Sequence, residues 1–356
     1  MNRHPHGSPK RMVTSAFDEA SLLENARSGD ENAFAALTGS YQGELRSHCY
    51  RMLGSVQDAE DAVQNALLRA WRSLDKFEGR SSVRAWLYAI ATNTTLDITR
   101  HRSRRELPAD FGPAAPIGSA LEDAINEPIW LEPYPNGWLS GGPVSPESRY
   151  EQRESVEIAF MILLQELPPL QRAVLILRDV LGFSAAEVAA QLETTVASVT
   201  SALQRARAAA QTRLPERSQQ QALRTLGDEA VAGLAHRYAT ALETGDVDAL
   251  LSLLTEEATW CMPPMPTWFQ GHEALRAWLI PGPLSVRWRH HPTQANGQLA
   301  LGCYILDPAS ARYLPAVIDV LTLEADKIAA VTAFVFEDQA EATATFETFD
   351  LPAWLP

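Results

Sequence analysis

The chain has 356 residues, 46% of them hydrophobic and 21% charged, which is enough for about two or three packed domains and excludes wholesale disorder. Its 44 acidic and 30 basic residues give a net charge of −14, which argues against a histone-like coat for nucleic acid. The three cysteines lie far apart with no CxxC pair, so we expect a reducing cytoplasm and neither a disulfide framework nor a zinc site.

Composition and periodicity divide the chain into successive segments. The first residues are polar without an apolar run, which is typical of a tail and not of a signal peptide. No apolar stretch is long enough to span a membrane. The predicted segments are a disordered tail (1–15), an all-α domain (16–106), a Pro-rich linker (107–150), a second all-α domain (151–217), a polar joint (218–227) and an α+β domain with alternating strands (228–350).

A basic strip ends the first helical segment. Between Arg80 and Arg105 there are six arginines and one acid, a local charge of +5, with Trp86 and Tyr88 interleaved. Arginines neutralise phosphates and flat rings stack on bases, so the strip predicts nucleic-acid binding. The alternative is a solvated helix end whose two aromatic residues lie in the core.

An acidic face precedes this strip. Helical spacing places Asp58, Asp61 and Asn65 on one face and an apolar stripe on another. Such a face is either solvated or a docking surface for a basic partner helix.

Residues 58–105 contain DAEDAVQ, LLRAWR and FEGRSSVRAWLYAIATN, and this long gap-free run closely resembles region 2 of extracytoplasmic-function (ECF) sigma factors. The resemblance implies that the acidic helix binds the β′ clamp helices of RNA polymerase and that the strip reads the −10 promoter element. Where that family usually has an acid, this chain has Asn65, which implies a weaker clamp contact. The implied polymerase face is Asp58, Asp61 and Gln64, and the implied −10 face is Arg80, Ser81, Arg84, Trp86, Asn93, Asp97, Arg100, Arg102, Arg104 and Arg105.

The second helical segment contains a helix, a short turn and another helix. Ser184 and Glu187 have the spacing of a capping box, and the second helix should turn Val196, Val199 and Leu203 inward. This arrangement predicts a helix-turn-helix whose second helix enters the major groove, although any two-helix hairpin has similar periodicity. The side chains predicted to be exposed on that helix are Ser198, Thr200, Ser201, Gln204, Arg205 and Arg207.

Residues 166–213 resemble region 4 of ECF sigma factors, which implies binding of the −35 element by those exposed residues and of the polymerase β flap as a partner. That family often has Lys and Arg where this chain has Thr200 and Ala202. Binding of −35 DNA would therefore depend more on Arg205, Arg207 and Arg213.

The linker carries Trp130, Tyr134 and Trp138 among prolines. Exposed apolar clusters generally find a partner surface, so these rings are expected to pack on the chain's own helical domains or on a partner. Residues 106–157 have ten acids and two arginines, a net charge of −8. The resemblance places such a linker near the RNA exit path of polymerase, where its charge would mimic nucleic acid.

The C-terminal segment resembles the SnoaL-like branch of the nuclear-transport-factor-2 superfold, a curved sheet and helices around a conical pocket. Some relatives in that branch are cyclases with an Asp/His pair, and Asp319 with His290 would supply one. The preferred interpretation is a satisfied core histidine and an aspartate at a strand end, so no catalytic residue and no cofactor are assigned. The candidate pocket residues are Trp260, Met262, Trp268, Trp278, Trp288, His290, Tyr304, Asp319 and Phe334.

From Phe17 to the end, the chain resembles an ECF sigma factor with a fused SnoaL-like domain. This implies a dissociable, non-enzymatic RNA polymerase subunit for promoter-specific initiation, with core polymerase and promoter DNA as partners and no membrane. The C-terminal domain, with a net charge of −11, is expected to contact regions 2 and 4 and to replace a separate anti-sigma factor. The alternative is a small-molecule sensor or a cyclase-like enzyme, and a pocket lined by Trp and Met favours a sensor or scaffold.

Overall fold

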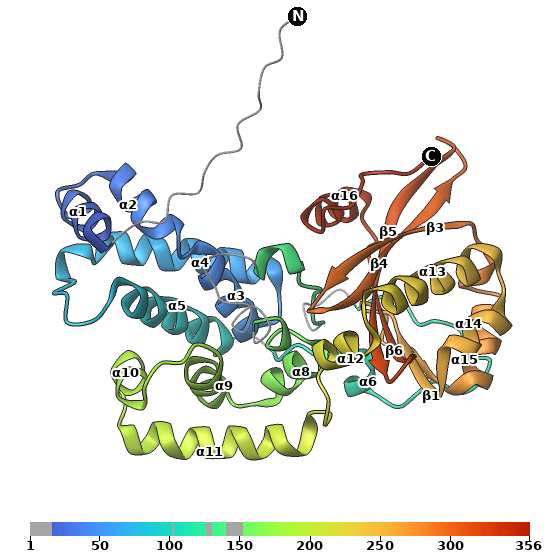
Figure 1. Ribbon diagram of the computed structural model, residues 1–356, viewed down its shortest axis with the longest axis horizontal. Helices are drawn as coiled ribbons and strands as arrows, with labels where there is room; N and C mark the ends of the chain where they lie inside the picture. Colours follow the sequence, from blue (N-terminus) through green and yellow to red (C-terminus); the bar gives the residue numbers. More distant parts are fainter. Residues whose placement is uncertain (1–15, 102, 126–129, 140–151) are drawn as a thin grey trace, which may run out of the picture.

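The computed structural model describes residues 16–101, 103–125, 130–139 and 152–356, so the predicted tail lies outside the described residues. Two groups of helices lie one above the other, and a six-stranded sheet with its own helices lies beside them (Figure 1). The predicted fold class, two all-α domains followed by an α+β domain, is confirmed. None of the described helices is long and apolar enough to cross a membrane.

The first helical domain is built around α3, whose residues 47–53 are all buried. Side chains of Asp30, Ser55 and Ser82 accept backbone N–H groups at the starts of α2, α4 and α5, as expected of helix N-caps. Gly54 ends α3 at φ 70°, a left-handed conformation that glycine adopts without strain. The helices are α1 (Ala16–Arg27), α2 (Glu31–Gly39), α3 (Gln42–Leu53), α4 (Val56–Arg72), η1 (Leu74–Lys76) and α5 (Val83–Thr99).

The second helical domain contains the predicted helix-turn-helix. The Ser184 Oγ accepts from the Glu187 N–H at 3.2 Å, and the Glu187 carboxylate accepts from the Ser184 N–H at 2.7 Å, which confirms the capping box. The polar joint predicted at 218–227, after this domain, forms the helix α12. The helices are α8 (Ile158–Glu166), α9 (Pro169–Leu175), the π-helical turn η3 (Ile176–Val180), α10 (Ala185–Gln191), α11 (Val196–Arg213) and α12 (Gln219–Leu226).

The C-terminal domain has one mixed sheet in the order β2-β1-β6-β5-β4-β3, with β1 and β6 parallel and the other pairs antiparallel. The elements are α13 (Asp228–Thr244), α14 (Val247–Leu253), β1 (Leu254–Cys261), β2 (Trp268–Gln270), α15 (Gly271–Leu279), η4 (Pro283–Ser285), β3 (Trp288–Ala295), β4 (Gln298–Asp307), β5 (Arg312–Glu324), β6 (Lys327–Val335) and α16 (Gln339–Thr348).

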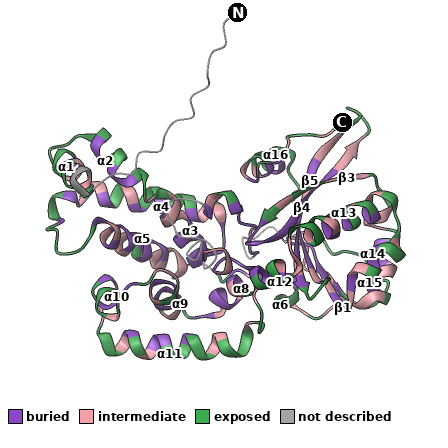
Figure 2. Cartoon of the chain, viewed as in Figure 1, coloured by how far each residue is buried: buried purple, intermediate pink, exposed green. Residues whose placement is uncertain are grey.

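The two faces of this sheet belong to different hydrophobic cores, because side chains alternate along a strand. Leu301, Cys303 and Ala333 pack with α13 and α15 in the core of the C-terminal domain itself. Ala300 and Tyr304, on the opposite face, join a core that runs through both helical domains. Buried residues accordingly line both α3 and the strands, while the outer side of α11 is exposed (Figure 2).

The linker runs from the first helical domain along the C-terminal domain and returns. It contains α6 (Pro108–Phe111) and η2 (Asn136–Leu139). Its three predicted aromatic residues pack on the chain itself: the Tyr134 ring lies 4.4 Å from that of Tyr50 in α3, the Trp130 ring lies 5.6 Å from that of Phe111, and the Arg46 guanidinium lies 3.9 Å from the Trp138 ring.

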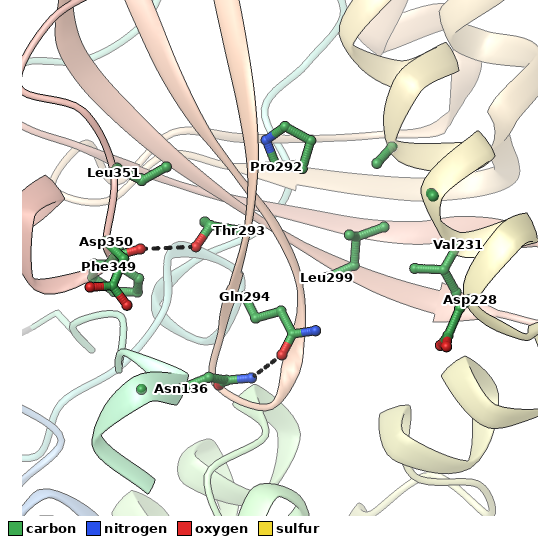
Figure 3. Close-up of a pocket in the computed structure, with 13 residues that line it drawn as sticks. Asn136, Asp228, Val231, Pro292, Thr293, Gln294, Leu299, Phe349, Asp350 and Leu351 are labelled. Carbon is green, nitrogen blue, oxygen red and sulfur yellow. Dashed lines mark hydrogen bonds between the residues drawn. The ribbon is translucent and has the colours of Figure 1, made fainter. Parts of the chain in front are cut away.

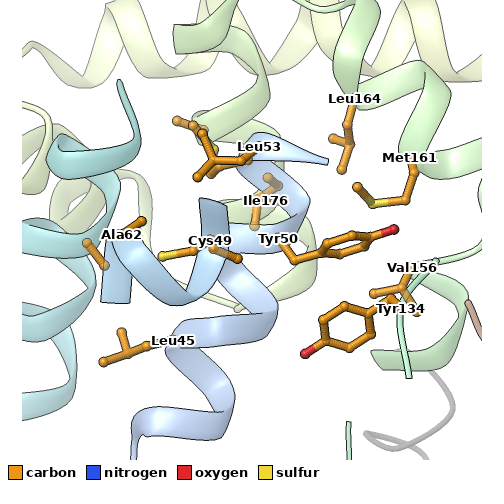
Figure 4. Close-up of a cluster of buried hydrophobic side chains, with 14 of the residues drawn as sticks. Leu45, Cys49, Tyr50, Leu53, Ala62, Tyr134, Val156, Met161, Leu164 and Ile176 are labelled. Carbon is orange, nitrogen blue, oxygen red and sulfur yellow. The ribbon is translucent and has the colours of Figure 1, made fainter. Parts of the chain in front are cut away.

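The hydrophobic contact between linker and helices is visible in Figure 4, where Tyr134 and Val156 face Tyr50 and Met161. These residues come from the linker, the entry to α8, α3 and α8. One cluster therefore ties both helical domains and the linker together.

The turn between β3 and β4 is the polar centre of this junction. Asn296 is fully buried at φ 52°, and its Nδ2 donates to the Tyr50 hydroxyl at 3.0 Å and to the Val156 carbonyl at 2.9 Å. Its Oδ1 accepts from the Tyr134 N–H at 2.8 Å. One side chain of the C-terminal domain thus bonds α3, the linker and the segment leading into α8.

Beside this turn is a cleft of about 600 Å³ between the linker, α13 and β3. Asn136 donates to the Gln294 side chain at 3.0 Å and Thr293 donates to the Phe349 carbonyl at 3.2 Å along its wall (Figure 3). These bonds bring the linker and the C-terminal segment to the same strand, β3.

Candidate functional site

The predicted polymerase face lies on α4, which presents alanines and Val63 to the core and polar residues to solvent. Asp61, Gln64 and Asn65 are exposed, as the helical spacing predicts. Asp58 differs, because it is largely buried and forms an ion pair with Arg105 at 2.8 Å. The exposed polar surface of α4 predicted to bind polymerase therefore centres on Asp61 and Gln64.

The predicted −10 residues follow one another along α5 and the loops that flank it, and their exposure differs. Trp86 is half-buried, with its ring 4.8 Å from that of Phe77, so it belongs partly to the core. Asp97 pairs with Arg69 and Arg100, each at 3.1 Å. Arg102 lies outside the described residues. Arg80, Ser81, Asn93, Arg100 and Arg104 are exposed, and Arg84, Trp86 and Asp97 are half-buried.

Arg105 is the clear departure from the predicted −10 face. Only 8% of its side chain is exposed, and it donates to Asp58 at 2.8 Å, to Glu132 at 3.1 Å and to the Trp130 carbonyl at 2.7 Å. A guanidinium with all these partners on the chain itself holds the linker to the first helical domain. The prediction that Arg105 faces promoter DNA is corrected by this geometry, since composition cannot show which arginine of a cluster turns inward.

Part of the predicted −10 face meets the second helical domain. The Arg84 guanidinium lies 5.1 Å from the Phe183 ring, and Tyr88 packs on the same ring at 5.4 Å. The Asn93 amide donates to the Gln191 carbonyl at 3.4 Å. In this arrangement α10 covers one side of α5.

The α11 helix presents most of its predicted DNA-reading residues to solvent. Thr200, Gln204, Arg205 and Arg207 are exposed, and Ser198 and Ser201 are half-buried. Val196, predicted to face inward, is 48% exposed because it begins the helix, where no neighbouring element covers it.

The α11 arginines have partners on their own domain. Arg207 makes a bidentate pair with Asp179 at 2.7 and 2.8 Å, Arg205 donates to Ser201 at 2.9 Å and Arg213 donates to Glu166 at 2.6 Å. Exposed pairs of this kind are weak, so a phosphate can compete for these arginines.

Residues of the C-terminal domain and Leu121 of the linker line a cavity of about 300 Å³. Six of the nine candidate pocket residues line it: Trp260, Met262, Trp278, Trp288, His290 and Asp319. Three do not. Tyr304 and Phe334 point to the opposite face of the sheet, because their neighbours Cys303 and Ala333 take the cavity side. Trp268 instead donates its Nε1–H to the Gly112 carbonyl of the linker at 2.8 Å.

The polar end of the cavity contains two separate pairs. Asp319 lies mid-strand in β5, not at a strand end, and accepts from the Tyr238 hydroxyl at 2.9 Å; burial raises the pKa of this carboxyl. His290 Nδ1 lies 3.3 Å from Glu243 on α13, and this contact lowers the pKa of Glu243. Asp319 and His290 therefore each have a hydrogen-bonding partner on α13, Tyr238 and Glu243. Within the described residues, no group of three or more His, Cys, Asp or Glu is arranged to hold a metal.

Comparison with known families follows the same division. Models described as Sigma-70 region 2, Sigma-70 region 4 and SnoaL-like domain match residues 37–105, 158–209 and 235–331. The ECF RNA polymerase sigma factor SigG of Mycobacterium tuberculosis (strain ATCC 25618 / H37Rv) is 42% identical over 348 residues, covering 94% of this chain and 90% of SigG. The chain belongs to the ECF sigma factors.

Other ECF sigma factors match different lengths of it. The ECF RNA polymerase sigma-E factor of Escherichia coli (strain K12) is 32% identical over 188 residues, which is 53% of this chain and 90% of sigma-E. The crystal structure of the M. tuberculosis ECF sigma factor SigJ superposes with a TM-score of 0.54 at 22% identity and covers 89% of this chain and 99% of SigJ, which shows a shared fold.

The hydrogen bonds that hold the predicted joint (218–227) between region 4 and the SnoaL-like domain were not predicted from the sequence. The Glu157 carboxylate accepts the Gln219 and Gln220 N–H groups at the start of α12, at 3.0 and 2.9 Å. Gln219 in turn bonds both backbone groups of Leu323 in β5, at 2.7 and 3.0 Å.

The Asn296-Gly297 dipeptide signals a turn, but no sequence pattern shows which distant groups that turn will contact.

Glu157 should make this joint sensitive to pH. Burial raises the pKa of Glu157 from 4.5 to about 7. Between pH 4.5 and about 7, Glu157 is therefore mainly protonated in the native state and mainly ionised in the unfolded state. The protonation of Glu157 contributes its full stabilisation below pH 4.5, and this contribution is lost as the pH rises to about 7. Above that pH the free energy of unfolding no longer depends on Glu157, and the total loss is at most about 3 kcal/mol. We expect the difference in unfolding free energy between wild type and Glu157→Gln to follow this course in denaturant titrations, because Gln stays neutral. A difference independent of pH would contradict the assignment.

Proposed function

We propose that this protein directs promoter-specific transcription initiation as a dissociable subunit of RNA polymerase. The observation that carries the proposal is the 42% identity with an ECF RNA polymerase sigma factor along 94% of the chain. The exposed α4 face supports a polymerase contact through Asp61 and Gln64. The exposed arginines that flank α5 and those of α11 support contacts to −10 and −35 DNA. A cytoplasmic location follows from this role.

The test is run-off transcription by core polymerase with the full-length chain. Asp61→Arg combined with Gln64→Ala should lower the affinity for core polymerase by at least tenfold, because a charge reversal places like charges against the basic partner helix. Thermal unfolding should not change, since both side chains are exposed. Glu229→Ala, on the exposed start of α13, is the matched control and should bind as wild type does. Full affinity of the double variant, or failure of wild type to initiate at any promoter, would refute the proposal.

The SnoaL-like domain acts in this proposal as a brake carried by the chain itself, without enzymatic activity. Two observations support this role: the hydrogen bonds of Asn296 at the junction, and the hydrophobic core that the domain shares with the helical domains. Tethering gives the domain a high effective concentration against regions 2 and 4. Polymerase or DNA then has to compete with contacts within the chain.

A further inference from the structure

The cavity of the SnoaL-like domain combines aromatic walls with one polar end. Trp260, Trp278 and Trp288 line it together with methionines and valines, and Asp319 and His290 supply the hydrogen-bonding groups. Its volume of about 300 Å³ lies at the lower end of the ~300–1,000 Å³ typical of small-molecule sites. Apolar walls with few polar groups are the usual composition of such sites.

The mouth of the cavity is formed partly by the linker. Leu121, which belongs to the segment between regions 2 and 4, lines the cavity and is 42% exposed. Val286 on the same rim is 40% exposed. A molecule in the cavity would cover apolar surface on both, which is favourable at about 25 cal/mol per Å².

Residues 112–125 of the linker, which we call the strap, are bonded to the β1–β2 region beside the cavity. The Ala115 N–H donates to the Trp268 carbonyl at 2.8 Å, the Glu122 N–H to Thr267 Oγ1 at 2.9 Å and the Ile125 N–H to the Pro264 carbonyl at 3.1 Å. These bonds hold Leu121 over the cavity. The strap has little regular structure of its own, so this seating can open locally at low cost.

The strap is also close in sequence to the Arg105 anchor. Glu106, six residues before the strap, accepts the Leu131 N–H at 3.0 Å, and Arg105 bonds Asp58 on the polymerase-facing helix. The strap therefore begins seven residues after Arg105, whose ion pair with Asp58 reaches α4. The structure thus offers a short physical route from the cavity to region 2.

We propose that the cavity binds an uncharged, ring-containing small molecule with one hydrogen-bonding group, and that the strap is the lid of this site. Binding would couple the ligand to the linker, and the effect on transcription rests on the function proposed above. An uncharged ligand is favoured because burial raises the pKa of Asp319 and so disfavours the carboxylate that a cationic ligand would need.

The test uses the full-length protein with the neutral fluorophore N-phenylnaphthylamine, whose emission rises in apolar sites. We expect saturable binding, abolished in Val317→Phe, where a half-buried residue of the cavity wall is enlarged. Amide hydrogen exchange of peptides covering 112–125 should slow several-fold with the probe, while exchange in α11 should not change. Thermal unfolding of Val317→Phe, and of the Leu121→Ser variant described below, checks that each variant remains folded.

Leu121→Ser removes the apolar lid residue from an exposed position and should weaken probe binding several-fold. It should also abolish the slowing of strap exchange, because the two effects are reciprocal. Absence of saturable binding, binding that Val317→Phe leaves unchanged, or binding without slower strap exchange would overturn the proposal. Tighter binding of the cationic dye thioflavin T would overturn the assignment of an uncharged ligand. Neither readout involves polymerase, so failure here is distinguishable from failure of the sigma function.

Discussion

Replacing Arg105 with alanine is expected to lower the free energy of unfolding by about 3 kcal/mol, because it removes a buried cation from the largely buried Asp58 and the half-buried Glu132. Asp58 and Glu132 would each lose an ion pair, and the Trp130 carbonyl would lose a donor. The linker should then separate from region 2, with faster hydrogen exchange at residues 130–135. Denaturant titration and exchange measure these effects directly.

Arg100→Ala is the matched control for this prediction. Arg100 belongs to the same strip, but 72% of its side chain is exposed and its pair with Asp97 is a surface pair. We expect unchanged stability and weaker promoter binding in the polymerase complex, with a smaller salt dependence. If Arg105→Ala kept full stability and lost only promoter binding, Arg105 would be a DNA contact as the sequence first suggested.

Replacing Asn296 with alanine should have the largest effect on the junction between domains, about 3–5 kcal/mol. Three hydrogen bonds of a fully buried side chain are lost, and the Tyr134 N–H and the Val156 carbonyl lose their Asn296 partner at ~1–3 kcal/mol each, while the Tyr50 hydroxyl keeps its bond to the Glu132 carbonyl. Alanine also tolerates the left-handed backbone less well than asparagine, at a cost of about 1 kcal/mol. Chemical denaturation and exchange at residues 134 and 156 report the loss.

Asn296→Gly separates the two causes, because glycine adopts a positive φ freely but makes no side-chain bonds. It should be about 1 kcal/mol more stable than the alanine variant and still well below wild type. If the SnoaL-like domain is a brake, run-off transcription by both variants at limiting sigma should rise several-fold over wild type. Unchanged transcription with a loosened junction would remove autoregulation while leaving the sigma function intact.

Several features were predictable because they are local in the sequence. The Ser184–Glu187 capping box lies within one turn, and the exposed face of α4 follows from a period of 3.6 residues. The alternating strands expected in the C-terminal domain follow from a period of two and include β5 and β6. Family motifs within continuous stretches of chain predicted the fold class, which the comparisons with known proteins confirm.

Other residues were predictable in kind but not in position. Phe334 and Tyr304 were expected in the pocket as large aromatic residues, but the register of the sheet decides which face each strand residue takes. Trp268 was expected there as well, and its Nε1–H instead bonds the linker. Arg105 has the same side chain as Arg100 and opposite surroundings.

The sequence by itself determined the family and the succession of two all-α domains and an α+β domain, because these depend on motifs within continuous stretches of chain. Only the tertiary structure decided that Arg105 is an anchor, that Asn296 bonds groups up to 246 positions away and that Leu121 covers the cavity. Such contacts join segments far apart in the chain. Their partners are selected by packing and by the need to satisfy buried polar groups, which no local pattern records.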